Sequence, residues 1–282
     1  MQFVSFSHKS RVAVGLVVGN TVHPLDTATG MIDLIENYEA IRAQQEKSLP
    51  ASGAGLPLAD VELLPAVPNP GKVVCLGLNY LEHAKEGGRT PPEYPTLFLR
   101  ATTSLAAANE DIAIPPVSNK LDYEAELAVI IGKTGKNIAQ ADAAGYIFGY
   151  TAFNDISVRD YQSRTLQWAS GKNFDRTGAL GPVIVTTDEL PPFASGLSIR
   201  TVLNGEVMQD SNTADMIFDL PRIIADVSEI MTLHPGDVIV TGTPSGVGFA
   251  RKPPVWLAAG DKVRIEIEGI PALENRIIAA TA

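Results

Sequence analysis

The sequence predicts an α+β fold rich in β-strands, in which a mixed sheet folds into a roll or distorted barrel beside a small N-terminal α+β module. After about residue 70, short apolar runs bounded by turn residues dominate the chain, as is typical of strands. Helical segments are few and do not alternate regularly with the strands, which disfavours a doubly wound parallel sheet. The chain has 282 residues and 45% hydrophobic content, enough for one large core with a small companion.

The N-terminal module is expected over residues 1–65. Strands are predicted at 2–7, 11–19 and around 21–25, with a turn at Gly19 and Asn20, and a helix at 31–49. Residues 50–72 are rich in proline, glycine and alanine, which indicates a linker packed across the surface.

The second part, residues 70–282, is expected to hold the functional site. The longest predicted helix covers 216–233, and Asn204 and Gly205 predict a hairpin turn. The predicted strands are 72–80, 96–101, 121–132, 146–155, 181–190, 197–209, 237–243 and 262–269.

The charge balance restricts the classes of partner. There are 22 basic against 32 acidic residues, a net charge of -10, so we expect no nucleic-acid partner and no anionic membrane surface. No stretch approaches the roughly 20 apolar residues that cross a bilayer. The single cysteine, Cys75, lies in an apolar run and has no partner for a disulfide, so we expect a cytoplasmic protein.

The run 121–132, LDYEAELAVIIG, places carboxylates in front of a strongly apolar stretch. In a strand, Asp122, Glu124 and Glu126 would share one face. An isolated pair of this kind more often marks a wet face. Here a third acid, Asp155, ends another apolar run, and three hard oxygen donors without histidine or cysteine suit Mg²⁺ or Mn²⁺.

Asp155 also opens the run DISVRDYQ, which is expected to be helical. Helical spacing would place Arg159 and Gln162 on the face of Asp155. One turn would then present a metal ligand, a cation and an amide. A local ion pair between Asp155 and Arg159 that supports the helix start explains the same pattern equally well.

A second group, His83 and Glu86, lies in NYLEHAKEGG. At helical spacing the carboxylate orients the imidazole and raises its basicity, which would make a general base; a polar surface helix is the alternative. The glycines that follow could allow this segment to close over a ligand.

The run TGTPSGVG, residues 241–248, follows an apolar strand. Its glycines, Gly242 among them, permit close approach of the backbone to a ligand, and Thr243 adds a hydroxyl. The lysine of a nucleotide-binding loop is missing. Lys172, in WASGKNFD, is by itself most simply a solvated charge.

Taken together, six segments resemble the fumarylacetoacetate hydrolase family in its compact bacterial form over roughly residues 70 to 280. They are LGLNYLEHAKE, LDYEAELAVIIG, FNDISVRDYQ, GKNFD, LGP and the run from Met216 to Gly248. The resemblance implies a mixed β-roll, a homodimer, and a Mg²⁺ or Mn²⁺ site that acts on a small anionic 2-oxo acid. Thr177, Ala179 and Arg100 depart from the residues common in the family, which leaves the distal end of the substrate open.

Position by position, the resemblance implies roles for the residues singled out above. Metal ligands would be Glu124, Glu126 and Asp155, and His83 with Glu86 would activate water. The substrate's carboxylate and oxo oxygens would be held by Arg159, Gln162, Lys172 and Thr243.

The expected reaction is metal-dependent hydrolysis of a C–C bond in a 2,4-dioxo acid, such as fumarylpyruvate or maleylpyruvate, releasing pyruvate and a carboxylic acid. The metal and Lys172 would stabilise the enolate that forms. Oxaloacetate decarboxylation and isomerisation of a 2-hydroxydienoate would use the same enolate and stay open as alternatives. A binding protein that converts nothing is the remaining alternative.

Overall fold

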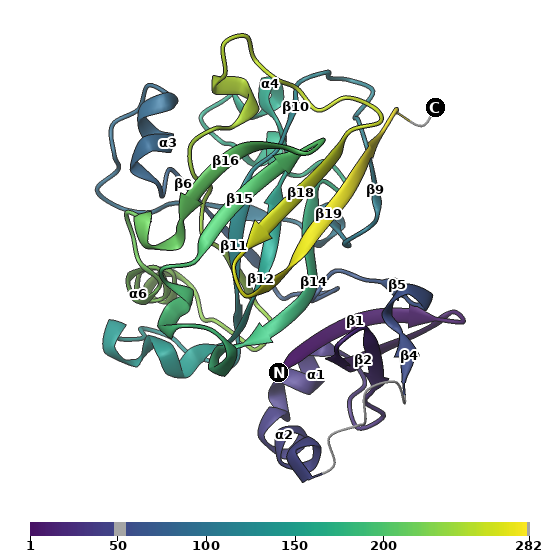
Figure 1. Ribbon diagram of the computed structural model, residues 1–282. Helices are drawn as coiled ribbons and strands as arrows, with labels where there is room; N and C mark the ends of the chain where they lie inside the picture. The colour runs from purple at the N-terminus through teal and green to yellow at the C-terminus, as the bar shows by residue number, and fades with distance from the viewer. Residues whose placement is uncertain (48–54, 281–282) are drawn as a thin grey trace.

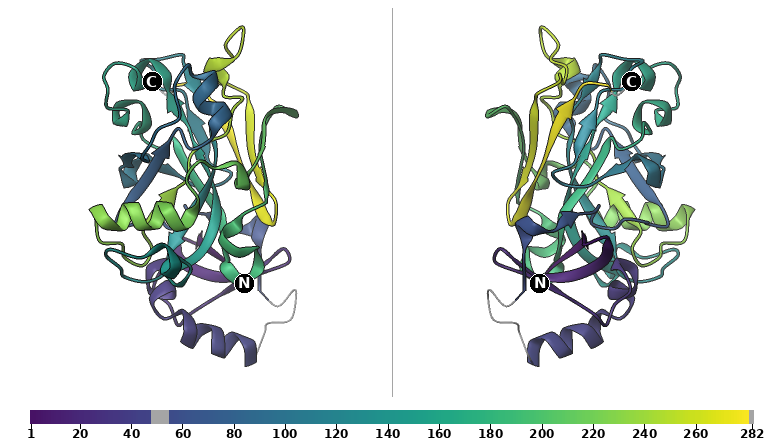
Figure 2. Two further views of the ribbon diagram at one scale, coloured as in Figure 1. Left: turned by 90° about the vertical axis from the view of Figure 1, so that its left-hand side faces the viewer. Right: turned by 90° about the vertical axis from the view of Figure 1, so that its right-hand side faces the viewer.

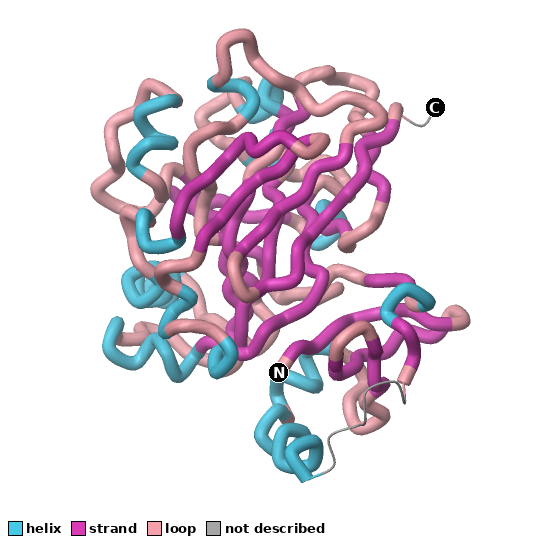
Figure 3. Tube along the Cα trace, viewed as in Figure 1, coloured by secondary structure: helices cyan, strands magenta, loops and turns pink. Residues whose placement is uncertain are grey.

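The computed structural model describes residues 1–47 and 55–280, so the first part of the expected linker lies outside the described residues. Two large sheets form the fold (Figures 1 and 3), which confirms the predicted α+β class. Both sheets are open, so the fold is a roll and no closed barrel forms from the described strands. No helix of the described residues is long and apolar enough to cross a membrane.

The larger sheet runs through the centre of the molecule. In spatial order its strands are β4 (Leu56–Pro57), β3 (Thr21–Pro24), β2 (Arg11–Val18), β1 (Gln2–His8), β14 (Gly178–Thr186), β12 (Ile147–Asp155), β11 (Ala125–Ile131), β17 (Val238–Val240), β6 (Val73–Gly77) and β7 (Thr96–Arg100), with β5 (Glu62–Leu63) on β1 and β8 (Leu105–Ala106) on β14. Most neighbours are antiparallel, but β17 and β6 are parallel. The sheet is therefore mixed, as predicted.

The second sheet lies against one face of the central strands β11, β12 and β14 (Figure 2). Its strands in order are β16 (Glu206–Asn212), β15 (Ser198–Leu203), β18 (Lys262–Ile267), β19 (Ile270–Ile278) and β9 (Asp111–Ala113). Every residue of β11, β12 and β14 is buried, because the second sheet covers one face and a second apolar cluster covers the other.

Helices are short and lie around the sheets. They are α1 (Met31–Glu36), α2 (Tyr38–Lys47), α3 (Leu81–Glu86), α4 (Arg159–Gln162), α5 (Ala169–Lys172) and α6 (Leu220–Ile230). The longest one begins where the Asp219 carboxylate accepts a hydrogen bond from the Arg222 amide, a common N-terminal cap. The segment predicted as one helix at 31–49 is helical over 31–36 and 38–47, but Asn37, with φ -105° and ψ 18°, separates α1 from α2; residues 48 and 49 lie outside the described part.

The N-terminal strands continue the large sheet. Gln2 and Phe3 of β1 pair with Val185 and Ile184 of β14, and Phe3 packs against the Phe148 ring. The expected boundary near residues 65–70 falls between β5 and β6. The N-terminal strands and the central strands are thus joined by backbone hydrogen bonds.

Two strand and helix predictions near the carboxylates are wrong. The run 121–132 is not one strand: β10 (Leu121–Asp122) pairs with β13 (Ser157–Val158), whereas β11 begins at Ala125 and pairs with β12. The run from Asp155 is not a helix, because the same β10–β13 pairing keeps Ser157 and Val158 extended, and α4 begins only at Arg159. Both breaks arise from pairing between distant segments.

Candidate active site

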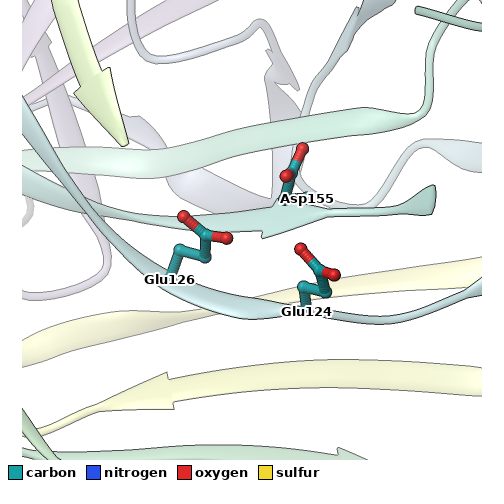
Figure 4. A group of neighbouring side chains, drawn as sticks. All are labelled: Glu124, Glu126 and Asp155. Atoms are coloured by element: carbon teal, nitrogen blue, oxygen red, sulfur yellow. The ribbon is translucent and has the colours of Figure 1, made fainter. Parts of the chain in front are cut away.

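Three carboxylates converge where β11 and β12 meet. Figure 4 shows Glu124 and Glu126 on one segment and Asp155 on the neighbouring strand. All three are buried, and one oxygen of each lies within 4.8 Å of the others. The sequence prediction that these acids share one site agrees with this geometry. Asp122 is not part of the group, because the backbone leaves the strand between Asp122 and Ala125.

Glu124 and Asp155 are neutralised by buried cations. The Lys172 Nζ lies 2.7 Å from Glu124 Oε2 and 2.5 Å from Asp155 Oδ2. Arg100 Nε lies 2.5 Å from Asp155 Oδ1. Burial alone would raise the pKa of Glu124, but Lys172 and Arg159 lower it well below its usual range. Glu124 is therefore held as a carboxylate.

Glu126 differs from the other two acids. Its Oε2 accepts a hydrogen bond of 2.6 Å from the Gly242 amide, and no ion pair to a described cation accompanies it. Burial, followed by the nearby Asp155 and Glu124, raises its pKa well above the usual value. Burial and the two neighbouring acids thus disfavour the charged form of Glu126, and a bound divalent cation would stabilise it, because carboxylate oxygens are the ligands that such a cation prefers. The cluster therefore fits a divalent metal.

Arg159 occupies a different position from the one predicted. Its Nε lies 2.8 Å from Asp122 Oδ2 and its Nη1 lies 2.6 Å from Glu124 Oε1, so the ion pair with Asp155, which was the alternative explanation of this run, is wrong. Nη1 also donates to Gln162 Oε1 at 2.9 Å. The remaining nitrogen, Nη2, is buried without a partner among the described residues. Arg159 borders the cavity beside the acids, and its guanidinium carbon lies 4.6 Å from the centroid of the Phe249 ring.

His83 and Glu86 form a hydrogen-bonded pair at one wall of the same cavity. The distance from His83 Nδ1 to Glu86 Oε1 is 2.8 Å, as the spacing in α3 predicts. Glu86 Oε2 accepts from the Gly246 amide at 2.9 Å, so the carboxylate is fixed from both sides. With Nδ1 occupied by Glu86, Nε2 is the nitrogen that can accept a proton.

The loop 241–248 holds acids through its glycine amides. Gly242 donates to Glu126, Gly246 to Glu86, and Gly248 to Asp122. Gly242 and Gly246 have φ angles of 94° and 101°, which favour glycine. The sequence suggested that Gly242 contacts the substrate. In the structure Gly242 does not border the cavity, and its amide donates to Glu126 instead.

Thr243 does border the cavity, and its hydroxyl is oriented from behind. Its Oγ1 accepts a 2.8 Å hydrogen bond from Gln209 Nε2, which leaves the hydroxyl hydrogen for a ligand. Gln209 Oε1 accepts from the Ala125 amide, between Glu124 and Glu126. Sequence analysis missed Gln209, because nothing local indicates that β16 crosses behind this loop.

The cavity in front of these groups has a volume of about 350 Å³. Its inner end is bordered by Glu124, Glu126, Lys172, Arg159 and Thr243. Four aromatic side chains also border the cavity, namely Phe98, Trp168, Phe249 and Trp256. Asp155 and Glu86 lie behind this lining. The arrangement can hold a small anion beside a cation site, with an imidazole base at the wall.

Comparison with known proteins gives relatives of several activities. The chain is 40% identical over 271 residues to oxaloacetate tautomerase Fahd2a, mitochondrial, of Rattus norvegicus, covering 96% of this chain and 86% of that protein. The name places that relative in mitochondria, while the compartment of this chain stays a prediction.

Two solved structures superpose on the whole chain. Maleylpyruvate hydrolase from Sphingobium sp. SYK-6, in complex with manganese(II) ion and pyruvate, has a TM-score of 0.83 and 32% identity, with 100% of each chain covered. The 5-carboxymethyl-2-hydroxymuconate delta-isomerase from Mycobacterium smegmatis has a TM-score of 0.79 and 33% identity, with the same coverage.

The family model for the fumarylacetoacetate (FAA) hydrolase C-terminal domain matches residues 72–278. Hydrolase, isomerase and tautomerase names all occur among the relatives. The chain therefore belongs to the fumarylacetoacetate hydrolase family.

Proposed function

We propose that the protein is a Mg²⁺- or Mn²⁺-dependent enzyme that removes a proton from C3 of a small anionic 2-oxo acid and stabilises the resulting enolate. Keto–enol tautomerisation of oxaloacetate is the first candidate, supported by the relative that carries this name. The observation that carries the proposal is that a hydrogen-bonded His83 borders the same cavity as Glu124 and Glu126 of the three-acid cluster.

The metal would be held by Glu124, Glu126 and Asp155. When bound, it supplies positive charge next to the developing enolate oxygen. This positive charge also offsets the net charge of -10, which otherwise repels an anionic substrate.

The substrate's head group would be held by donors of the chain itself. Arg159 Nη2 is the unpartnered donor at the inner end of the cavity, and guanidinium groups bind carboxylates well. Gln162 fixes the guanidinium through Nη1. The Thr243 hydroxyl, oriented by Gln209, would donate to a second oxygen. Lys172 would add a positive charge at the oxo oxygen.

His83 would move the proton. Nε2 takes a proton from C3, the electron pair of the C–H bond forms the C2–C3 double bond, and the oxo oxygen becomes negatively charged. Returning the proton to that oxygen gives the enol, and returning it to C3 gives the keto form. Glu86 stabilises the protonated imidazole through Nδ1, because an adjacent carboxylate favours the charged ring.

C–C hydrolysis of an acylpyruvate, the reaction expected from the sequence, is the second candidate. The maleylpyruvate hydrolase structure with manganese and pyruvate supports it. In this reaction His83 takes its proton from water, whose oxygen attacks the 4-oxo carbon. The C3–C4 bond then breaks, and its electron pair gives the same pyruvate enolate, which is protonated at C3. Decarboxylation and isomerisation remain further variants of this enolate chemistry.

A substrate panel separates these reactions. Chelator-treated protein is assayed with and without Mg²⁺ or Mn²⁺ for loss of the enol absorbance of oxaloacetate, for pyruvate from maleylpyruvate and fumarylpyruvate, and for CO₂ from oxaloacetate. Metal-dependent enol loss without CO₂ supports the tautomerase, and pyruvate from an acylpyruvate supports the hydrolase. No metal-dependent reaction with any substrate would contradict the proposal.

We also propose that the protein is a homodimer, as the resemblance to the family implies. Light scattering on the purified protein measures its mass in solution. The 30.0 kDa of a single chain would contradict the dimer, and twice that mass supports it.

A further inference from the structure

The cations that border the cavity fall into two tiers. Arg159 and Lys172, at the inner end, each contact two carboxylates. Arg89 and Lys120 border the outer part of the same cavity, and within residues 1–47 and 55–280 neither is in an ion pair. An acidic chain therefore keeps two positive charges outside ion pairs at the mouth of its cavity.

Arg89 is tied to both the base and the cavity wall. Its amide donates to the carbonyl of Ala84, the residue after His83, at 2.8 Å, which ties the Arg89 backbone to α3. Its guanidinium lies 5.5 Å from the Trp168 ring centroid. A cation over an indole face is stabilised without a carboxylate, so the guanidinium nitrogens remain available as donors.

Trp168 and Phe98 form an apolar wall of the cavity that reaches Lys172 beside the acid cluster. A β-carbon on Gly77 would meet this ring at 2.0 Å, so the ring occupies space that only glycine leaves. Trp168 packs edge-on against Phe98 at 6.0 Å, and the Lys172 Nζ lies 5.3 Å from the Phe98 ring. An apolar wall thus joins the inner cations to Arg89.

The backbone of Lys120 is hydrogen-bonded to Arg159 of the inner end. Its carbonyl accepts a 3.0 Å hydrogen bond from the Arg159 amide, and its own amide donates to the Ser118 hydroxyl. The nearest acid on the cavity lining outside the cluster is Asp160, whose Oδ1 accepts from the same Ser118 hydroxyl at 2.6 Å. The mouth therefore has two positive charges against one negative charge.

From this arrangement we infer that Arg89, assisted by Lys120, forms a subsite for a second carboxylate, so that the enzyme selects dicarboxylic over monocarboxylic 2-oxo acids. The inference rests on the proposed function and names its substrate class. One anionic end lies at Arg159 and the acid cluster, the apolar middle lies along Phe98 and Trp168, and the second carboxylate meets Arg89. A planar guanidinium binds such a group with two parallel hydrogen bonds.

The test compares two acids that share the 2-oxo acid head. In the presence of Mn²⁺, calorimetry measures binding of 2-oxobutyrate, with one carboxylate, and 2-oxoglutarate, with two. The wild type should prefer 2-oxoglutarate. Arg89→Gln should weaken the binding of 2-oxoglutarate about five- to tenfold, which is the scale of a partly exposed charged hydrogen bond. The affinity for 2-oxobutyrate should stay within twofold of the wild type.

Arg164→Gln is the matched control. Arg164 lies over the Tyr161 ring and borders a neighbouring hollow, outside the main cavity, so this variant makes the same charge change and should keep the preference. Lys120→Gln should weaken the binding of 2-oxoglutarate by a smaller factor than Arg89→Gln does.

The outcomes separate the two levels of the proposal. If the wild type binds neither acid with Mn²⁺, the proposed function is contradicted. If it binds both acids equally, the function stands and the subsite is refuted. If Arg89→Gln weakens the binding of both acids equally, a lost structural contact explains the data and the subsite is refuted. If Arg164→Gln weakens the binding of 2-oxoglutarate as much as Arg89→Gln does, a general charge effect explains the data and the subsite is again refuted.

Discussion

The inner and outer ends of the cavity are built in opposite ways. At the inner end, buried acids and cations contact one another, and backbone amides from the loop 241–248 hold three of the acids. At the outer end, Arg89 and Lys120 are exposed and engage no carboxylate among the described residues. Under the proposed function, the chemistry takes place at the hydrogen-bonded inner end, and the choice of substrate depends on the mouth.

The largest effect is expected from Glu126→Gln. Glu126 is the acid whose charge no cation neutralises, so its amide variant should bind Mn²⁺ poorly and lose about 10³-fold in metal-dependent turnover. Titration of Mn²⁺ followed by electron paramagnetic resonance measures the binding, and circular dichroism checks the fold. Asp226→Asn changes a carboxylate that is paired with Arg222 on α6 and serves as the control. Unchanged Mn²⁺ affinity in Glu126→Gln would contradict the metal assignment.

Replacing the base should give the second largest effect. His83→Ala is expected to reduce kcat about 10²-fold or more while Mn²⁺ binding persists, because a positioned base contributes on that scale. Glu86→Gln should reduce kcat by a smaller factor, since the imidazole remains. Steady-state kinetics at saturating Mn²⁺ measures both variants, and a His83→Ala enzyme with near-normal kcat would remove His83 from the mechanism.

Much of this inner end could be predicted from the sequence. Glu124 and Glu126 were marked by carboxylates entering an apolar strand, and the pairing of His83 with Glu86 follows from helical spacing within six residues. The partner of Arg159 could not be predicted, because it depends on β10 pairing with β13 across 36 residues of chain from Asp122 to Val158. The ion pair of Arg100 with Asp155 and the contacts of Gln209 were not predicted for the same reason, because they join distant segments.

Gln209 offers a finer test of the inner end. Gln209→Glu replaces the donor to Thr243 by an acceptor, so the Thr243 hydroxyl should turn toward it and KM should rise about tenfold, the scale of one hydrogen bond to a charged group. Thr243→Val should raise KM by a similar factor. If Gln209 acts through Thr243, the double variant should be no worse than Thr243→Val alone; additive losses would show that Gln209 acts by another route.

The last effect concerns the pH dependence of metal binding, which changes no residue. Burial, with Asp155 and Glu124 nearby, raises the pKa of Glu126, and the protonated acid cannot bind a cation. Apparent Mn²⁺ affinity should therefore fall as the pH falls through this raised pKa, by about tenfold per pH unit for one proton, beginning above the range of an ordinary glutamate. Calorimetry in two buffers of different ionisation enthalpy should show proton release. A flat profile down to the usual glutamate range would contradict this account of Glu126.

The central claim is that the inner end forms an enolate by removing a C3 proton. Proton NMR of pyruvate in D₂O tests this step directly, because loss of the methyl signal reports exchange at C3 whatever reaction follows. The account predicts rapid exchange with wild-type protein and Mg²⁺, and loss of that exchange with chelator or in His83→Ala. A wild-type protein that binds Mg²⁺ and pyruvate without accelerating the exchange would contradict the claim.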